Sequence, residues 1–414
     1  MPGVESPQAE SRVGITDLAV RGFRTARDVS FSVGPLCALV GEADAGKSNL
    51  LAAIRAVLDP AAAPLSAADA AAGSDGRVSI RATLADGREV LLEDTVGDGA
   101  VMEDSGLPVV FLPAEARAGP VLAGPTGRRQ EHEAVAIFRR EAGHRPPTSA
   151  ARALSLVDAL ESCRARRIAG VVLLIEEPEL YLRPQAQRYL YRLLRDFSQQ
   201  NQVIYSTHSP AFLNVARLDE LVFVERLPSE GTHAVRPEPV SADDDFRVMT
   251  EFDAARSELF LARAAVLVEG LTEKLVLPFV FSALGYDADR EAISIVECGG
   301  KPNIPFFARI CRATGIPFVV VHDSDRRSSG RLAPADQALN ALIAETAGEE
   351  RVIVLEPDFE AAAGLVGHKP ERAWREFAER GAAEMPKQLV RAAELAVSLA
   401  NQYTVTGVPI DMKS

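Results

Sequence analysis

The chain has 414 residues, 47% of them hydrophobic, and a formal net charge of −13 at pH 7, so it is long enough for two or three domains with buried cores. The acidic balance argues against a protein that coats nucleic acid by bulk attraction, but not against an enzyme that holds DNA in a local groove. The four cysteines lack metal-binding or disulfide-framework spacing, and without a long apolar run or a signal-like N-terminus we expect a cytoplasmic protein that contacts no membrane.

A phosphate-binding loop follows the first strands of the chain. Residues 15–33 alternate apolar and polar side chains, which predicts two strands around a basic turn at 21–25. A buried strand at 36–40 then runs into Gly-Glu-Ala-Asp-Ala-Gly-Lys-Ser, and a helix follows from Ser48. In this context, backbone N–H groups and the helix N-terminus can face phosphates, Lys47 can reach the β- and γ-oxygens, and Ser48 can bind Mg²⁺. The residues expected to bind ATP here are Gly41, Asp44, Ala45, Gly46, Lys47, Ser48 and Asn49.

The next segments predict a hairpin and a polar arm. After a loop or loosely helical insert at 59–76, two alternating runs at 78–84 and 89–93 flank Asp86-Gly87, a strong hairpin signal. An apolar strand is expected at 109–112. The polar stretch 115–147, which includes Arg128, Arg129, Arg139 and Arg140, favours either a solvated helical arm or a surface that faces DNA or a second subunit.

Acidic residues end the next apolar strand. A helix is expected over 149–168, and the apolar run 171–175 leads directly into Glu176 and Glu177, the pattern of a Walker B strand. At the carboxyl end of a parallel strand, Glu176 would hold Mg²⁺ and Glu177 would polarise the attacking water. A helix at 183–199, a strand at 202–205 and a turn with His208 follow.

The phosphate loop, Glu-Glu-Pro-Glu and Ser-Thr-His-Ser-Pro, in this order, resemble the ABC ATPases, in particular the RecF and SMC-like branch that acts on DNA. The resemblance covers about residues 13–226 and implies that His208 senses the γ-phosphate. Two features depart from the branch. The segment 147–152 stands where the ABC signature with its Ser-Gly pair is expected, and Arg183 stands where a histidine is common. The sequence therefore predicts ATP binding and leaves open whether ATP is hydrolysed.

The second half repeats a strand, acid and helix pattern. After a Pro-rich and acidic connector, a buried strand at 264–268 delivers Glu269 to a turn, and Glu273 follows in the first turn of a helix. A strand at 293–296, a Gly-Gly-Lys turn and a helix at 303–314 come next, and the strand from 317 ends in Asp323 and Asp325. In extended backbone these two aspartates would point the same way, as a pair of oxygen ligands suited to Mg²⁺. The alternation predicts a parallel sheet with a metal-binding edge.

Val-Glu-Gly-x-Thr-Glu, Gly-Gly-Lys and Asp-x-Asp together resemble the Toprim domain of topoisomerases, primases and certain nucleases. The pairing with an ABC-type ATPase resembles the overcoming lysogenization defect (OLD) nucleases, over most of the chain. We therefore expect an α/β protein with an ABC/RecF-like ATPase domain at 1–227, a connector at 228–258 and a Toprim domain at 259–414.

The OLD resemblance implies a two-metal site for Mg²⁺ or Mn²⁺ and a catalytic lysine. Its catalytic residues would be Glu269, Asp323 and Lys387, with Lys369 as the competing lysine, and its metal ligands would be Glu269, Glu273, Asp323, Asp325, Asp358 and Glu360. The function implied is an ATP-controlled DNA endonuclease or nickase in phage defence or DNA repair, acting as a homodimer, alone or with a partner protein. The alternative is a nucleotide-switched module that binds DNA or a partner, with a Toprim domain that does not cleave.

Overall fold

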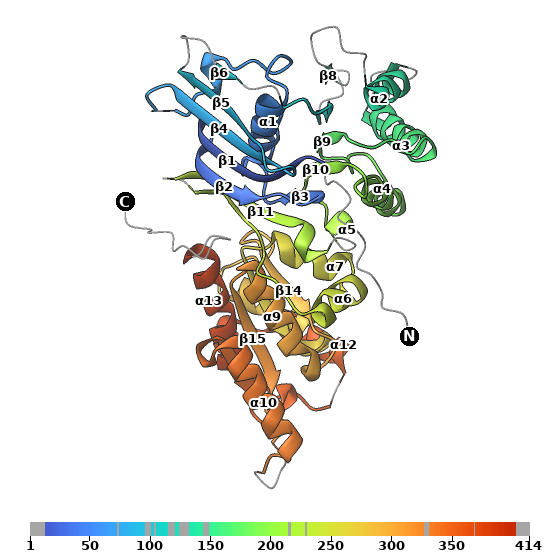
Figure 1. The fold of residues 1–414 in the computed structure, drawn as a ribbon. Coiled ribbons are helices and arrows are strands. Elements are labelled where there is room, and N and C mark those ends of the chain that lie inside the picture. The colour runs from blue at the N-terminus through green and yellow to red at the C-terminus, as the bar shows by residue number, and fades with distance from the viewer. Residues whose placement is uncertain are drawn as a thin grey trace, which may run out of the picture. The chain divides into compact units, whose positions relative to one another are not determined.

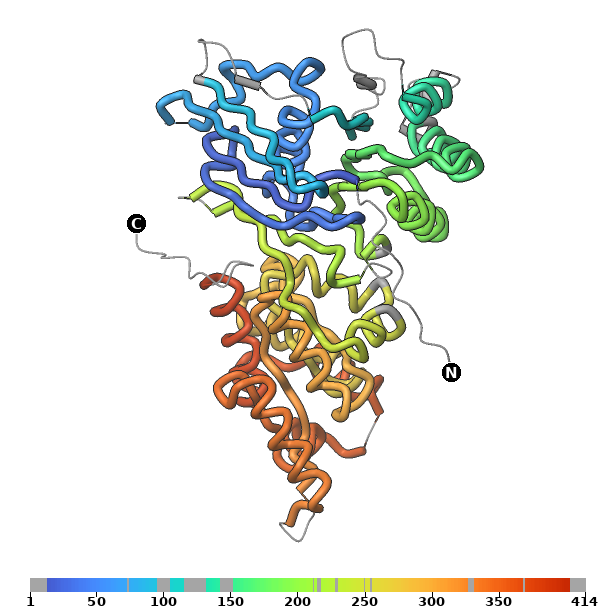
Figure 2. Tube along the Cα trace, in the orientation of Figure 1, coloured from blue at the N-terminus to red at the C-terminus, as the bar shows by residue number. Residues whose placement is uncertain are grey.

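The computed structural model describes residues 13–402, except residues 73, 96–100, 103–104, 115–120, 124–131, 144–148, 214–216, 228–229, 327–330 and 368. The chain divides into two compact units, the first ending at Arg236 and the second beginning at Pro237 (Figures 1 and 2). Both units combine helices with a parallel or largely parallel sheet, so the predicted α/β class is confirmed. Among the described residues, no helix has the length and hydropathy needed to cross a bilayer.

A seven-stranded sheet in the order β12-β11-β3-β10-β9-β7-β8 carries the phosphate loop. Its strands are β3 (Leu36–Val40), β7 (Val109–Leu112), β8 (Val121–Ala123), β9 (Val172–Glu176), β10 (Gln202–Thr207), β11 (Leu221–Leu227) and β12 (Gly231–Val235). The five inner strands are parallel, and the edge strands β8 and β12 are antiparallel to their neighbours. The central strands β3 and β10 are buried along their whole length, as expected for a sheet covered on both faces.

A second, antiparallel sheet in the order β2-β1-β4-β5-β6 shares a core with the first through helix α1. Its strands are β1 (Ile15–Phe23), β2 (Ala26–Ser32), β4 (Arg77–Leu84), β5 (Glu89–Thr95) and β6 (Val101–Met102). Helix α1 (Lys47–Leu58) packs against strands of both sheets (Figure 1). Its buried Leu50 and Ile54 join Ile80 and Ile204 in one apolar cluster. The two predicted N-terminal strands and the hairpin are confirmed.

The remaining helices of this unit are α2 (Glu133–Gly143), α3 (Ser149–Ala165), α4 (Pro184–Phe197) and α5 (Pro210–Leu213), with short 3-10 turns at Ala67–Asp69 and Leu218–Glu220. Helix α3 packs against both α2 and α4. Helix α2 lies within the predicted arm 115–147, whereas Arg128 and Arg129 lie outside the described residues. The helices expected over 149–168 and 183–199 are confirmed.

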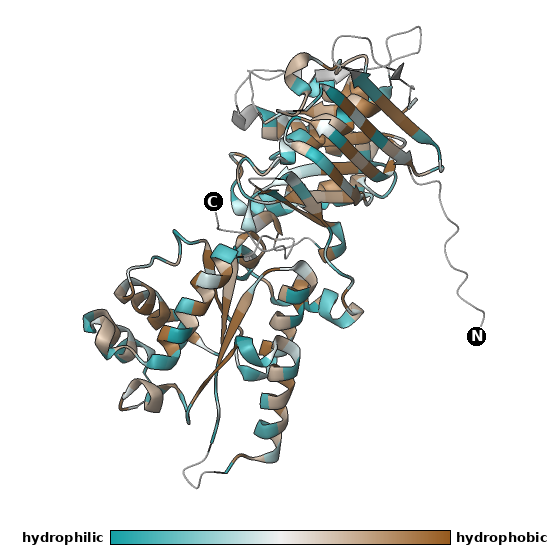
Figure 3. Cartoon of the chain, turned by 90° about the vertical axis from the view of Figure 1, so that its left-hand side faces the viewer, coloured by the Kyte–Doolittle hydropathy of each residue, from teal (hydrophilic) through white to brown (hydrophobic). Residues whose placement is uncertain are grey.

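The second unit is built on a four-stranded parallel sheet in the order β14-β13-β15-β16. Its strands are β13 (Ala264–Val268), β14 (Ile293–Glu297), β15 (Phe318–Asp323) and β16 (Val352–Leu355), and its helices are α8 (Leu271–Ala283), α9 (Ile304–Thr314), α10 (Pro334–Ala347), α11 (Phe359–Ala363), α12 (Pro370–Glu379) and α13 (Lys387–Gln402). Short 3-10 turns lie at Lys301–Asn303, Glu349–Arg351 and Ala382–Glu384. Helices α8, α12 and α13 pack together, and α9 packs with α10. The strands are coloured mainly as hydrophobic and the outer helices carry hydrophilic stripes (Figure 3).

The segment expected as a connector, 228–258, is largely folded. In its described part, β12 belongs to the first unit, while α6 (Ala242–Glu251), α7 (Ala254–Ser257) and the start of the 3-10 turn Glu258–Leu261 belong to the second. Phe252 stacks on Phe260 and contacts Phe306 and Phe307 of α9. The acids that suggested a linker instead lie at the starts of helices: Asp243, Asp244 and Asp245 form the first turn of α6, whose N-cap Ser241 accepts a hydrogen bond from the Asp244 N–H. Asp253 is the N-cap of α7.

Candidate nucleotide and metal sites

The phosphate loop lies between β3 and α1, where the sequence placed it. The Lys47 ammonium donates to the carbonyl oxygens of Gly41 and Glu42 at 2.8 and 2.7 Å, so it lies curled within the loop. Burial lowers the pKa of Lys47, and Glu177 and Glu179 counteract that effect. Ser48 is exposed, and Asn49 donates to the Thr25 hydroxyl at 2.6 Å. The lysine, hydroxyl and helix N-terminus are thus together at one place.

Neighbouring strands leave no room for a side chain at the two glycines of the phosphate loop. A Cβ on Gly46, which has a φ of 108°, would lie 2.1 Å from the Thr232 hydroxyl oxygen. A Cβ on Gly41 would lie 2.0 Å from the Val224 carbonyl oxygen. Any side chain at these positions would push β11 or β12 away from the loop.

Parallel registry brings the predicted acids and histidine to the same sheet edge as the loop. Val40 is paired with Thr207, and Ser206 with Glu176, so β3, β10 and β9 end side by side. Glu176 accepts a hydrogen bond from the Ala114 N–H at 2.9 Å. Glu177, at a left-handed φ of 43°, has a carboxylate oxygen 2.7 Å from His208 Nδ1.

Glu179 is a buried member of this group to which the sequence analysis assigned no role. It is 4% exposed, accepts hydrogen bonds from the Thr207 hydroxyl and the His208 N–H, and has one oxygen without a hydrogen-bond partner. Burial and the neighbouring Glu177 raise the pKa of Glu179. Ligand atoms of Glu177, Glu179 and His208 lie within 4.8 Å of one another, so this edge can accept a cation.

The segment expected at the ABC signature instead supplies an arginine. Pro147 and Thr148 lie outside the described residues, and α3 begins at Ser149. The Arg152 guanidinium donates to the carbonyl oxygens of Leu112 at 3.3 Å and Glu177 at 3.2 Å, and to that of Glu176. Burial lowers the pKa of Arg152, partly offset by the three acids of the Walker B segment. Arg152 therefore ties α3 to the strand ends that carry the acids.

In the second unit, the predicted carboxylates gather around the carboxyl ends of β13 and β15. The Asp323 N–H donates to Glu269 at 3.4 Å, and Glu273, in the first turn of α8, is 5% exposed. Burial and the carboxylates of Glu273, Glu269, Asp325 and Asp358 raise the pKa of Asp323 to about 8. Burial also raises the pKa of Glu273, with contributions from Glu269 and Glu360. All six acids predicted as ligands thus belong to one electrostatic cluster.

The backbone beyond the end of β15 sets the direction of Asp325, and not the alternation of side chains along a strand that the sequence predicted. Strand β15 ends at Asp323, and Asp325 has a left-handed φ of 59°, so strand alternation does not orient it. Its N–H donates to the Pro357 carbonyl oxygen at 3.1 Å. Asp358 caps α11 by accepting from the Ala361 N–H at 2.8 Å.

Three lysines, two exposed and one buried, differ in their relation to this cluster. Lys387 is exposed at the first residue of α13, and its catalytic role stays a prediction, as does that of exposed Lys369. Lys301, which the sequence analysis quoted in Gly-Gly-Lys but gave no role, is 4% exposed and forms an ion pair with Asp325 at 2.6 Å. The signal that could have identified it is a lysine directly after a glycine turn at a strand end.

The residues of the second site fit a divalent cation. One buried oxygen of Asp323 has no hydrogen-bond partner, and the donor set consists of carboxylates, which Mg²⁺ and Mn²⁺ prefer. Burial, and after it the neighbouring carboxylates, raises the pKa values of Asp323, Glu269 and Glu273, and a bound divalent cation would counteract both effects.

Comparison with known proteins assigns both units. The Toprim domain of the overcoming lysogenization defect protein-like family matches residues 260–325, and an AAA ATPase domain matches residues 151–213. The first match contains Glu269, Glu273, Lys301, Asp323 and Asp325, and the second contains Arg152, Glu176, Glu177, Glu179 and His208.

The chain is 40% identical to the OLD nuclease of Thermus scotoductus over 222 residues, which are 49% of this chain and 42% of that protein. It is 29% identical to the Old nuclease of Escherichia phage P2 over 165 residues, 38% of this chain and 28% of that protein. The C-terminal region of the Burkholderia pseudomallei OLD protein aligns at 19% identity with a TM-score of 0.27, covering 34% of this chain and 98% of that one. The chain spans less than half the length of these two curated relatives. The chain therefore contains a segment that matches an AAA ATPase domain, followed by a segment that matches an OLD-like Toprim domain, and it is similar to OLD nucleases over part of its length.

Proposed function

We propose that this protein is an ATP-binding DNA endonuclease or nickase that depends on Mg²⁺ or Mn²⁺, with phosphodiester hydrolysis in the Toprim domain controlled by the ATPase domain. The observation that carries the proposal is the convergence of one buried carboxylate, Glu273, and two half-buried ones, Glu269 and Asp323, at the ends of β13 and β15, where an Asp323 oxygen lacks a hydrogen-bond partner. The similarity of the chain to two OLD nucleases supports it.

In the mechanism that we propose, the metal ligands are Glu269, Glu273, Asp323, Asp325, Asp358 and Glu360. Bound Mg²⁺ or Mn²⁺ held by these residues would supply an activated water and charge stabilisation for the leaving 3′ oxygen. Glu269, whose pKa is raised by burial, is our choice for the carboxylate that receives the proton of the attacking water. Asp323 would bind metal through the buried oxygen that has no hydrogen-bond partner, and Lys387 or Lys369 would balance charge on the scissile phosphate.

In the ATPase domain, Lys47 would exchange the carbonyl oxygens of Gly41 and Glu42 for the β- and γ-phosphates, while Ser48 and Glu176 would hold Mg²⁺. Glu177 would orient the attacking water, and His208 would contact the γ-phosphate. A Glu177 carboxylate oxygen and His208 Nδ1 lie 2.7 Å apart, so in this mechanism His208 would exchange its contact with Glu177 for one with the γ-phosphate.

A plasmid nicking assay tests the nuclease proposal. Supercoiled DNA would be incubated with Mg²⁺ or Mn²⁺, with and without ATP, and with wild type, Asp323→Asn, Lys47→Ala and the exposed α10 control Glu345→Gln. We expect wild type and Glu345→Gln to nick or linearise DNA and Asp323→Asn to lose at least about 100-fold in rate. Intact DNA with wild type under every metal and nucleotide condition would contradict the proposal.

The second candidate is a nucleotide-switched module that binds DNA or a partner without cutting. It is favoured by the absence of a recognisable Ser-Gly signature at 147–152 and by the pairing of Glu177 with His208, both of which suit an ATPase that holds ATP without cycling. Under either candidate we propose a homodimer in the cytoplasm. A role in phage defence or DNA repair, with or without a partner protein, completes the proposal.

A further inference from the structure

We propose that Lys301 is a positioning residue of the carboxylate site and that its ammonium group holds Asp325 ready for the metal. The inference deepens the proposed nuclease function and rests on it, because it concerns the same cluster of acids. The proposal concerns Lys301 at the metal ligands, whereas Lys387 or Lys369 is expected to balance charge on the scissile phosphate.

Lys301 contacts the Asp-Ser-Asp segment at two points. Its Nζ donates to the Asp323 carbonyl oxygen at 2.5 Å and to Asp325 Oδ2 at 2.6 Å. The Lys301 side chain is 5% exposed, and a buried ammonium is costly unless acceptors and counter-charge surround it. Lys301 is therefore part of the acid cluster and not a surface lysine.

Asp325 needs such a contact because the sheet does not orient it. The residue lies beyond the end of β15 at a φ of 59°, and its side chain is 43% exposed. A half-exposed aspartate on a left-handed residue can adopt several rotamers, and an ion pair with a buried donor selects one of them. Since metal ligands need fixed orientation, the partner that holds a ligand affects metal affinity.

The turn that carries Lys301 is tied to the strand that carries Glu269. The Gly300 N–H donates to the Glu269 carbonyl oxygen at 2.8 Å, and the Cys298 N–H donates to the Val268 carbonyl oxygen at 2.9 Å. Gly299 and Gly300 have φ values of 72° and 117°, which permit the tight turn. One turn thus links the ends of β13 and β15, from which Glu269 and Asp325 come.

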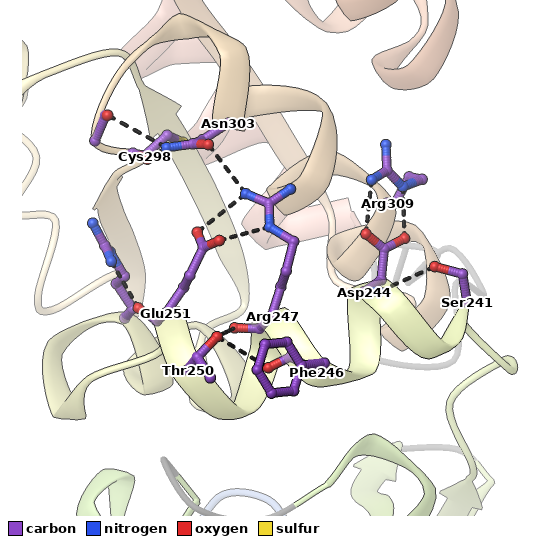
Figure 4. Close-up of polar contacts among 11 residues, drawn as sticks. Ser241, Asp244, Phe246, Arg247, Thr250, Glu251, Cys298, Asn303 and Arg309 are labelled. Carbon is purple, nitrogen blue, oxygen red and sulfur yellow. Dashed lines mark hydrogen bonds and ion pairs between the residues drawn. The ribbon is translucent and has the colours of Figure 1, made fainter.

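Helix α6 braces the same turn through Asn303. The Asn303 amide donates to the carbonyl oxygens of Cys298 at 3.0 Å and Gly299 at 3.3 Å, and its Oδ1 accepts from Arg247 at 3.1 Å (Figure 4). Arg247 is held in turn by Glu251 at 2.6 Å. The position of Lys301 is therefore set by contacts outside the acid cluster, as expected for a residue that positions a ligand.

Binding of Mn²⁺ to the full chain, followed by electron paramagnetic resonance without DNA or nucleotide, tests the proposal. Asp323→Asn supplies the baseline for binding elsewhere. We expect Lys301→Met to weaken Mn²⁺ binding about 10-fold or more, Lys301→Arg to recover part of the loss, and the control Lys274→Met on α8 to bind like wild type. Asn303→Ala should weaken binding in the same direction by a few-fold, so that a Lys301→Met variant that fails to fold does not decide the matter.

Cleavage kinetics separate positioning from direct contact with the phosphate. We expect Lys301→Met to need more Mn²⁺ for half-maximal cleavage and to recover kcat at saturating Mn²⁺. Unchanged or tighter Mn²⁺ binding by Lys301→Met, or a lowered kcat at saturating Mn²⁺, would overturn the proposal. Wild type that binds Mn²⁺ at the carboxylates but leaves DNA intact would overturn the nuclease function alone. Wild type that binds no more Mn²⁺ than Asp323→Asn would overturn both.

Discussion

Acidic side chains in both units lie close together, and burial disfavours their charge. The pKa of Asp323 is raised to about 8, and those of Glu269, Glu273 and Glu179 are raised as well. In each case burial is the first cause and a neighbouring carboxylate adds to it. A bound divalent cation relieves both effects, so the free energy of unfolding should respond to metal and to pH.

For Asp323 the sign of the pH effect follows from its pKa. Its folded-state pKa of about 8 lies above the ordinary value of 3.8, so the folded protein binds the proton more tightly than the unfolded chain does. The free energy of unfolding should therefore fall as pH rises between those two values and level off above about pH 8. Because the group is partly solvated, we expect a loss on the order of 1 kcal/mol from this residue.

Urea unfolding of metal-free protein at pH 5, 7 and 9 checks this prediction. Asp323→Asn should become progressively more stable than wild type across the series, and Glu345→Gln should follow wild type. Mg²⁺ should restore the free energy of unfolding that metal-free wild type loses at pH 9. Parallel curves for wild type and Asp323→Asn would show that the carboxylate carries no such penalty.

Lys47 should dominate nucleotide affinity. Its ammonium already lies within the loop, bonded to the carbonyl oxygens of Gly41 and Glu42, and charge-assisted bonds to phosphate are worth about 1.5–3 kcal/mol. We expect Lys47→Ala to weaken ATP binding by about 10- to 100-fold, measured by calorimetry, with Lys274→Ala unchanged. Equal affinities for wild type and Lys47→Ala would mean that ATP binds elsewhere.

At the scale of elements, hydrophobic periodicity was sufficient to predict the strands and helices that place Lys47, Glu176, Glu269 and Asp323, because each follows a buried apolar run. What periodicity could not predict is how side chains meet across the sheet. Arg152 reaches three backbone carbonyls from a helix, and Lys301 reaches Asp325 from a turn 24 residues away. Such contacts depend on tertiary packing, which one sequence does not encode as a local pattern.

Helix α3 should depend on Arg152 for its attachment to the sheet. Replacing Arg152 with Met removes the donor to the carbonyl oxygens of Leu112, Glu176 and Glu177 and leaves them less satisfied, which should lower the free energy of unfolding by about 2 kcal/mol. Arg164→Ala on the same helix removes an exposed ion pair with Asp196, 3.6 Å long, and should cost less than about 0.5 kcal/mol. Urea titrations of the two variants check the contrast, and equal losses would show that the carbonyl contacts of Arg152 contribute nothing special.

At the scale of the whole molecule, the chain consists of two units that each have their own core. The first unit packs its two sheets around α1, and the second packs α8, α12 and α13 against its parallel sheet. Units of this kind can usually fold separately. If the ATPase domain controls the Toprim domain, this control must be lost when the two are separated, while the carboxylate chemistry remains.

Expression of residues 237–414 alone tests whether the carboxylate chemistry lies in the second unit and its control by ATP in the first. We expect the fragment to unfold cooperatively and to bind Mn²⁺ with an affinity within about 10-fold of the full chain, because the acids and Lys301 all lie within it. Its DNA cleavage should not respond to ATP, whereas cleavage by the full chain should respond and Lys47→Ala should remove the response. If ATP did not change the rate of cleavage by the full chain, the proposed control of the Toprim domain by the ATPase domain would be wrong. A folded fragment that binds Mn²⁺ but cuts no DNA would place part of the DNA-binding surface, or of the dimer that presents it, in residues before 237.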